Sequence, residues 1–188
     1  MADDKDAKME TLTSLSGEFY SLVEASAARL RLKKNPIVEA YIAGVLASKA
    51  KQTDESKNED EALIFRLTDA MQKNTLESFT SLGDDLLFIT GYFPESFDSK
   101  SDRKYSILIG RKAYHRASSI VEVKGFDDAL YRLLSVKFEA YSDVIGDVRL
   151  RVREKLDDFE IFELCKLWDS TKDIKIKKKL ESLGVKID

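Results

Sequence analysis

Apolar residues recur along most of the chain at steps of three and four positions, the spacing of α-helices that bury one side. The first such stripe consists of Leu12, Leu15, Phe19, Val23, Ala27 and Leu30. Charged residues such as Glu18 and Arg29 flank this stripe. The sequence has no hairpin dipeptide between alternating residues and no internal repeat. The pattern therefore predicts an all-α fold.

Residues that start and stop helices divide the chain into about eight helical segments. Asn35 fits an N-cap and Pro36 the first helical position, while Gly125 fits a stop and Asp127 the next cap. The segment near 52–59 has no apolar residue and predicts a flexible loop. Residues 1–10 are acidic and polar and predict a disordered tail. Residues 11–188 are then expected to form a single helical domain, a multi-helix bundle.

Four helical patterns follow residue 100. The first buries Ile107, Gly110, Tyr114, Ala117 and Val121. The second comprises Leu130, Leu134, Phe138, Tyr141 and Ile145, and its period continues at Val148, Val152 and Leu156. A shorter helix is expected around Ile161, Leu164, Cys165 and Trp168. The last helix is expected to run from a cap at Asp173 to Gly184.

The stretch SLGDDLLFITGYFPESF, residues 81–97, combines acids, glycines and large apolar residues. If Gly83 and Asp84 open a helix, apolar side chains surround it, so the helix near 83–91 is expected at the centre of the bundle. Gly91 and the face from Gly110 to Ala117 are smooth and can approach a neighbour closely. We expect them to cross, with aromatic residues around the crossing: Tyr92, Phe93, Phe97, Tyr105 and Tyr114.

The composition is that of a folded protein and points to no particular partner. The chain has 188 residues, of which 43% are hydrophobic and 35% charged, and its formal net charge is -3. The length and the hydrophobic fraction suit a protein with one core. The small net charge does not indicate binding to nucleic acid or to an anionic membrane, nor an acidic solvating tail. The single cysteine, Cys165, excludes an internal disulfide and fits a reducing compartment. Without a signal-like N-terminus or a bilayer-length apolar run, a cytoplasmic protein with no membrane contact is expected.

The adjacent acids Asp84 and Asp85 are candidates for chemistry, because carboxylates in apolar surroundings can have raised pKa values and act as acids or bases. The structural alternative is that acids in a first helical turn cap the helix and offset its dipole. Tyr105 or Tyr114 is a donor that could bind Asp84. His115 lies beside a basic helical edge. Its ring either faces solvent or contributes to a ligand site. The candidate ligand-binding residues are therefore Asp84, Tyr105, Tyr114 and His115.

Known catalytic and metal chemistries lack their residues. A carboxylate-bridged centre needs Glu-x-x-His pairs and structural zinc needs four Cys or His ligands, but His115 is the only histidine. A nucleophilic Cys165 would need nearby positive charge, and its place on an apolar helix side favours a buried thiol. No glycine-rich phosphate loop occurs. We expect no catalytic residue, no metal and no cofactor.

Two basic segments, RLRVREK at 149–155 and KIKKK at 175–179, could contact phosphates. Acids interrupt or flank both, namely Glu154, Asp157, Asp158 and Glu181. A solvated helix face explains them equally well, so nucleic acid is not the expected partner. Two hypotheses remain: an adaptor or regulatory module that binds a protein partner or a second copy, and a small-molecule-binding domain or enzyme with a pocket near Asp84, Tyr105 and Tyr114. A closed core around Asp84 favours the first, and an open polar cavity the second.

Three short motifs carry a resemblance to a family: LGDDLLFITGYFPESF, YSILIGRKAYHRAS and LWDSTKDIKIKKKLESLGV. Together they resemble an uncharacterised family of bacterial proteins of about this length. The resemblance implies a helical single domain and no known activity, so it assigns no catalytic residues. Ser106 departs from the family pattern, because it stands where a second aromatic residue beside Tyr105 is expected.

Overall fold

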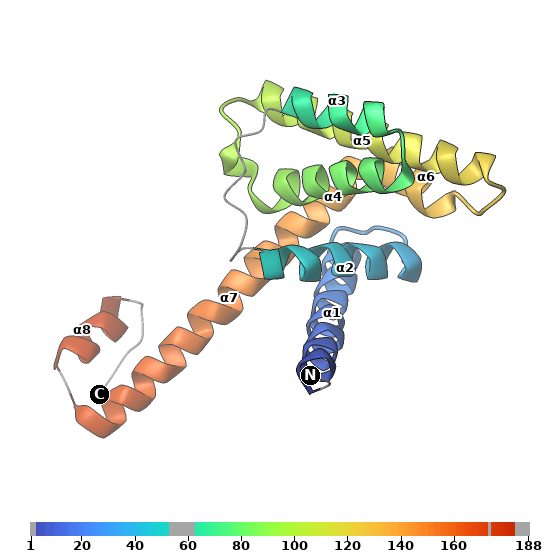
Figure 1. Cartoon of the computed structure of the whole chain (residues 1–188). Helices are drawn as coiled ribbons and strands as arrows, with labels where there is room; N and C mark the ends of the chain where they lie inside the picture. Colours follow the sequence, from blue (N-terminus) through green and yellow to red (C-terminus); the bar gives the residue numbers. More distant parts are fainter. Residues whose placement is uncertain (1–2, 53–62, 173, 183–188) are drawn as a thin grey trace. The chain divides into compact units, whose positions relative to one another are not determined.

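The computed structural model describes residues 3–52, 63–172 and 174–182 (Figure 1). Within these ranges the chain forms α-helices and one short 3-10 helix, with no strand, which confirms the all-α class. The elements are α1 Asp3–Arg29, α2 Pro36–Gln52, α3 Leu63–Lys73, α4 Leu76–Tyr92, η1 Pro94–Ser96, α5 Lys100–Val123, α6 Ala129–Val136, α7 Phe138–Thr171 and α8 Ile174–Ser182. No helix of the described residues is long and apolar enough to cross a membrane.

The chain divides into two compact units, Met1–Val148 and Arg149–Asp188. This differs from the single domain expected over 11–188. The division falls within α7, which also contains the segment expected to form a separate shorter helix near Trp168. No glycine or proline follows Gly146 within α7, and its charged residues favour helix without needing a core. The helix therefore continues beyond the first unit's apolar stripe.

The N-terminal segment is helical from its third residue. Helix α1 begins at Asp3, inside the segment 1–10 that was expected to be a disordered tail. Residues 1–10 contain good helix formers and early acids, which suit a helix N-terminus. The expected loop near 52–59, apart from Gln52, lies outside the described residues. The expected cap at Asp173 and stop at Gly184 also lie outside them.

Local signals set the ends of α2 and α5 as predicted. Asn35 Oδ1 accepts a hydrogen bond from the Val38 N–H at 3.2 Å, and Glu39 Oε1 accepts one from the Asn35 N–H at 3.0 Å. Helix α2 then starts at Pro36. At the end of α5, Gly125 takes a φ of +78° and its N–H donates to the Glu122 carbonyl. This left-handed glycine ends the helix.

Helix α4 begins seven residues earlier than the sequence led us to expect. Thr75 is the N-cap, and its side chain accepts from the Ser78 N–H while the Ser78 hydroxyl accepts from the Thr75 N–H, a reciprocal capping box. The prediction that Gly83 and Asp84 open the helix is therefore wrong. Both lie in the middle of α4, so Asp84 and Asp85 do not cap a helix or offset its dipole.

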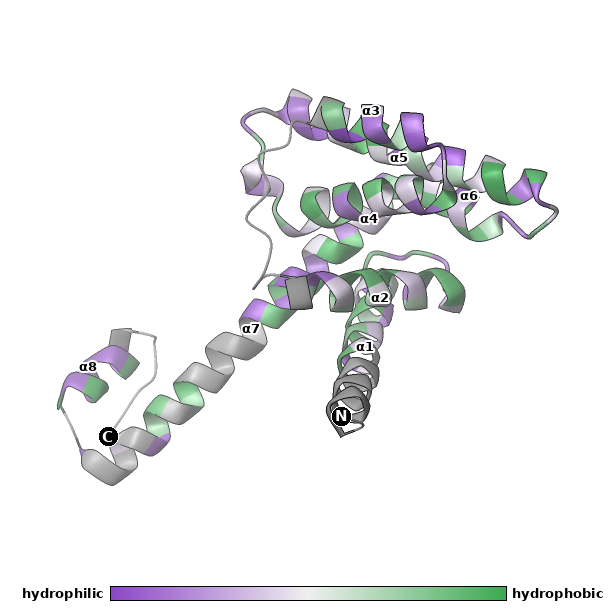
Figure 2. Ribbon diagram, viewed as in Figure 1, coloured by the Kyte–Doolittle hydropathy of each residue, from purple (hydrophilic) through white to green (hydrophobic). Residues whose placement is uncertain are grey.

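The predicted central position of the segment 83–91 is confirmed within the first unit. Helix α4 packs against α2, α3 and α5, and its hydrophobic residues are green in Figure 2. Its buried residues are Phe79, Leu82, Gly83, Leu86, Leu87, Thr90 and Gly91. A helix with neighbours on several sides can bury apolar residues around most of its circumference.

Close approaches in this unit involve the start of α7, which corrects the predicted crossing of Gly91 with α5. A Cβ atom on Gly91 would lie 2.5 Å from the Ser142 carbonyl oxygen, and a Cβ atom on Gly110 would overlap the Phe138 ring. Helices α4 and α5 run antiparallel, because the Thr90 carbonyl accepts from Arg103 Nε while Asp84 accepts from Tyr114. The Gly91 end of α4 therefore lies near the beginning of α5 and not near the face from Gly110 to Ala117, and Gly91 itself packs against Ser142 and Ile145 of α7. Of the aromatic residues expected there, Tyr114 instead packs against Gly83.

Candidate functional site

Asp84 lies in the middle of α4 and joins three helices of the first unit. Its Oδ1 accepts a hydrogen bond from the Tyr41 hydroxyl of α2 at 2.7 Å and from the Tyr114 hydroxyl of α5 at 2.6 Å. Tyr114 is fully buried, whereas Asp84 is partly exposed. Of the two donors expected for Asp84, Tyr105 and Tyr114, it is Tyr114 that forms the bond. One carboxylate oxygen thus fixes α4 against its neighbours on both sides.

A third tyrosine completes the surroundings of Asp84. The Tyr131 ring of α6 is perpendicular to the Tyr41 ring, with centroids 6.1 Å apart, and lies nearly parallel to the Tyr114 ring at 6.5 Å. Edge-to-face and offset pairs at such distances are favourable beyond their buried area. We call Asp84, Tyr41, Tyr114 and Tyr131 the tyrosine cluster. It brings α2, α4, α5 and α6 together around one acid.

Burial dominates the protonation chemistry of the tyrosine cluster. It raises the pKa of Asp84 above the ordinary value, and the two tyrosine hydrogen bonds oppose this rise because they stabilise the charged form. Burial and the nearby Asp84 carboxylate also raise the pKa of Tyr41, Tyr114 and Tyr131. The phenols therefore stay neutral donors, and the site combines one titratable carboxyl group with three hydroxyl groups.

Asp85, the next residue, has different partners. It forms ion pairs with Lys49 of α2 and Arg66 of α3. All three side chains are largely shielded, with exposed fractions of 16% for Asp85, 21% for Lys49 and 29% for Arg66. Asp85 therefore holds α2 and α3 to α4 by charge. As expected for neighbours on a helix, the two acids do not share a ligand face.

The four predicted site residues separate into two groups. Asp84 and Tyr114 meet in the tyrosine cluster, whereas Tyr105 is 47% exposed and His115 is exposed, both on the other side of α5. Tyr105 does not contribute to the surroundings of Asp84.

Sequence reasoning missed Tyr41, Tyr131, Lys49 and Arg66. A weak signal existed in α2, because Tyr41 and Lys49 are polar-tipped residues about two turns apart in a largely apolar segment. In the structure Tyr41 binds Asp84 and Lys49 binds Asp85. These pairings depend on how α2 packs against α4, which the spacing within α2 does not determine. Arg66 and Tyr131 stand among other charged and aromatic residues, and nothing in their spacing distinguishes them.

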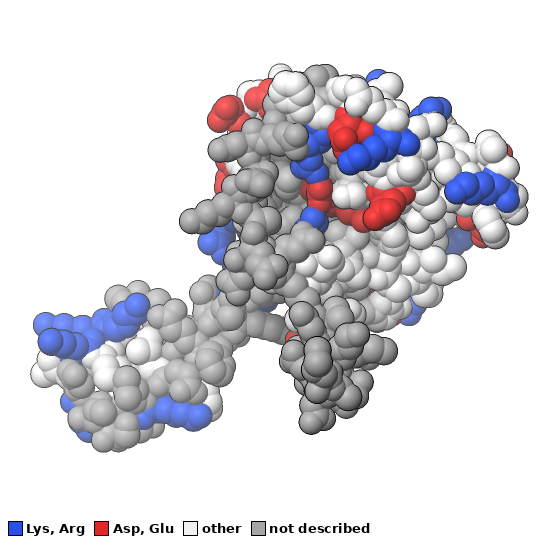
Figure 3. All heavy atoms as spheres, in the orientation of Figure 1, with Lys and Arg blue, Asp and Glu red and all other residues white. Residues whose placement is uncertain are grey.

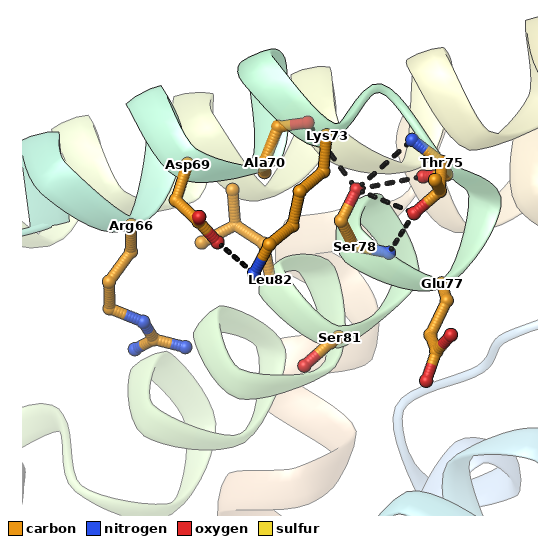
Figure 4. A pocket seen from close by; sticks show the side chains of 9 residues that line it. All are labelled: Arg66, Asp69, Ala70, Lys73, Thr75, Glu77, Ser78, Ser81 and Leu82. Atoms are coloured by element: carbon orange, nitrogen blue, oxygen red, sulfur yellow. Dashed lines mark hydrogen bonds and ion pairs between the residues drawn. The ribbon is translucent and has the colours of Figure 1, made fainter.

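A groove of about 530 Å³ lies between α3 and α4 (Figure 4). Its lining is Arg66, Asp69, Ala70, Lys73, Thr75, Glu77, Ser78, Ser81 and Leu82. Charges of both signs meet there (Figure 3), and Lys73 pairs with Asp69 at 2.7 Å while Arg66 pairs with Asp85. Asp84 lines neither this groove nor a cavity of about 10 Å³ beside Glu39. The tyrosine cluster therefore does not open into either space.

The exposed side of α5 carries a second group of functional candidates. Its exposed residues between the two ends of the helix include Lys104, Tyr105, Leu108, Lys112, His115 and Arg116, which we call the α5 outer face. Their spacing places them on one side of the helix. Within the described ranges, Lys104, Lys112 and Arg116 form no ion pair. Leu108 is 44% exposed and Tyr105 lies one turn before it.

The second unit holds Cys165, Trp168 and the basic segment of α8. The ammonium groups of Lys172 and Lys177 lie 5.1 Å and 5.7 Å from the centre of the Trp168 ring. In these cation–π contacts the positive charges of two lysines bind an aromatic ring of the same chain. Cys165 is partly buried. Among the residues that the structure describes, no group of three or more His, Cys, Asp or Glu side chains is arranged to hold a metal ion.

No family model, no curated protein and no solved structure matches the chain. The resemblance to an uncharacterised bacterial family remains a prediction. The function is therefore argued from the residues and their contacts alone.

Proposed function

We propose that the chain is a non-catalytic cytoplasmic interaction module, an adaptor or regulator that binds a protein partner through the α5 outer face. The observation that carries this proposal is the combination, on one helix side, of exposed apolar residues with cations that have no ion pair among the described residues. Tyr105 and Leu108 supply apolar area, and Lys104, Lys112 and Arg116 supply charge. Tyrosine and arginine are enriched where proteins bind one another, whereas lysine is depleted there, so the two lysines contribute charge and not a compositional signal.

The inner side of α5 supports such a role because it is firmly held. Gly110 packs against Phe138, Tyr114 binds Asp84, and Ala117 is fully buried. A helix held in this way presents its outer residues in a fixed arrangement. Less conformational entropy is then lost on binding, which favours affinity.

A ligand-binding or enzymatic role at Asp84 is the alternative, and one observation favours it. Burial raises the pKa of the Asp84 carboxyl group in aromatic surroundings, a property of many acid–base sites. The closed surroundings argue against it, because two hydroxyl groups occupy Oδ1 and Tyr105 lies elsewhere. Native mass spectrometry of the chain purified from its natural host distinguishes the two roles. A retained small molecule that is lost in Asp84→Ala would favour the alternative.

Site-specific photo-crosslinking in the natural host tests the interaction role. A benzophenone amino acid replaces Leu108 on the α5 outer face, and a matched variant carries it at Ala40, an exposed position of α2. We expect a distinct crosslinked protein from position 108 and none of the same mass from position 40. The proposal is wrong if irradiation gives no crosslinked protein specific to position 108 while circular dichroism shows both variants folded.

A further inference from the structure

We propose that the occupant of the α5 outer face is an acidic helical segment of a different protein. This inference rests on the proposed function and specifies the chemistry of the partner. It follows from the charge, the length and the apolar content of the face. Each of these properties restricts what can bind there.

The charge of the face is local. The chain as a whole has a net charge of -3, so the cations of α5 do not reflect a general excess. Lys104, Lys112 and Arg116 have no acidic partner within the described part of the chain, while Arg111 beside them donates to the Ser135 carbonyl at 3.2 Å. A complementary partner therefore carries several carboxylates, which steer the approach and fix the register.

The length of the face matches a short helix. Asp102, which binds Ser99, and Glu122 place acids at its two ends and limit the cationic part to residues 104–116. Twelve steps of about 1.5 Å give a length of roughly 18 Å, or about three turns. A partner helix of similar length with acids three and four residues apart would place carboxylates along these cations. Tyr105 and Leu108 would contact its apolar residues near one end.

Other occupants fit less well. A two-fold dimer through this face would place the same cations opposite one another, which repels a second copy. A nucleic acid favours a continuous cationic track, but exposed Leu108 interrupts this one and acids end it. An anionic membrane favours a broad apolar helix side, whereas this face exposes only two apolar residues between positions 104 and 116. An acidic helix uses both the charges and the apolar pair.

Charge reversal tests the inference with the crosslinking variant at position 108. Lys112→Glu with Arg116→Glu is compared with the matched pair Arg31→Glu and Lys33→Glu, which changes two exposed cations outside α5. Two like-charge contacts are expected to lower the crosslinking yield by roughly tenfold or more, and the control pair to leave it within about twofold. Peptide sequencing of the crosslinked product identifies the contacted segment. Reversal of its acids to lysine is expected to restore crosslinking to the α5 double variant.

The outcomes separate this inference from the proposed function. An acidic crosslinked segment, lost and then restored by the paired reversals, supports both. A crosslinked protein whose contacted segment has no excess of acids, or a crosslink only to a second copy, overturns the acidic partner and leaves an interaction module standing. Crosslinks to nucleic acid or lipid alone overturn both. Circular dichroism of each variant confirms that loss of yield does not come from unfolding.

Discussion

Asp84 and Asp85 are neighbours on α4 with the same side chain, yet their environments are opposite. Asp84 accepts hydrogen bonds from two neutral tyrosine hydroxyls, whereas Asp85 pairs with two cations. Successive residues of a helix point about 100° apart. One carboxylate therefore meets the tyrosines of α2 and α5, and the other meets charged residues of α2 and α3. The environment, and not the sequence position, sets what each acid does.

The two environments also differ in what removal of a charge would do. Asp84 has its charge opposed by burial, so neutralising it removes a cost while leaving an acceptor for the tyrosines. Asp85 pairs with Lys49 and Arg66, so its loss removes one ion pair from each of these two shielded cations. The comparison predicts that equivalent substitutions at the two positions have different consequences.

The largest expected effect on stability is at Tyr114, because its ring is fully buried and its hydroxyl donates to Asp84. Tyr114→Ala removes a fully buried ring between Gly83 and Phe138 and is expected to lower the free energy of unfolding by about 3–5 kcal/mol. Tyr114→Phe keeps the ring and removes only the hydroxyl, so a loss of about 1–2 kcal/mol is expected. Urea denaturation measures both. Equal losses would show that packing of the ring contributes little.

A smaller effect is expected at Asp85. Asp85→Asn removes both ion pairs while keeping the volume, and we expect a loss of about 1–3 kcal/mol, between the values for exposed and buried pairs. Lys49→Met in the same background is expected to recover part of the loss, because it removes the charge of one of the two cations that pair with Asp85. Thermal unfolding at low and high salt measures both variants. An Asp85→Asn variant as stable as the parent at low salt would contradict the role of charge at this position.

The raised pKa of Asp84 predicts a pH dependence of the free energy of unfolding. The pKa of Asp84 is raised in the folded state, so above its ordinary value of 3.8 the folded chain binds more protons than the unfolded chain. This acid therefore makes stability fall as the pH rises from its ordinary pKa to its raised one. Asp84→Asn is expected to remove that decline. Denaturant midpoints measured across mildly acidic pH for parent and variant test this, and identical pH profiles would contradict it.

Sequence patterns predicted the local features of this fold better than its long-range ones. Helix spacing, the start at Asn35 and Pro36 and the stop at Gly125 all follow from residues close in the chain, and each is present. The start of α4 was missed because its capping box consists of Thr75 and Ser78 in a polar segment that resembles a loop. Residues close in the chain determine where a helix begins and ends, but a short polar segment is compatible with either a loop or a helix cap.

The candidate site shows the same limit. Tyr114 was one of the two tyrosines expected as donors to Asp84, the other being Tyr105, whereas Tyr41 lies 43 positions from Asp84 and was not expected. The partner of Gly91 was also wrongly predicted, because it packs against Ser142 and Ile145 of α7 and not against α5. Such pairings depend on the packing of whole helices, and spacing along one helix contains no information about them.

The smallest expected effect is the coupling between Tyr41 and Asp84, and it tests most directly that the two acids act separately. In a double-mutant cycle, Tyr41→Phe and Asp84→Ala are expected to couple by about 0.5–1.5 kcal/mol, because either change removes the same 2.7 Å hydrogen bond. Tyr41→Phe and Asp85→Ala share no bond, so their effects are expected to add within about 0.5 kcal/mol. Equal coupling in the two cycles would mean that the adjacent carboxylates act as one group despite their different partners.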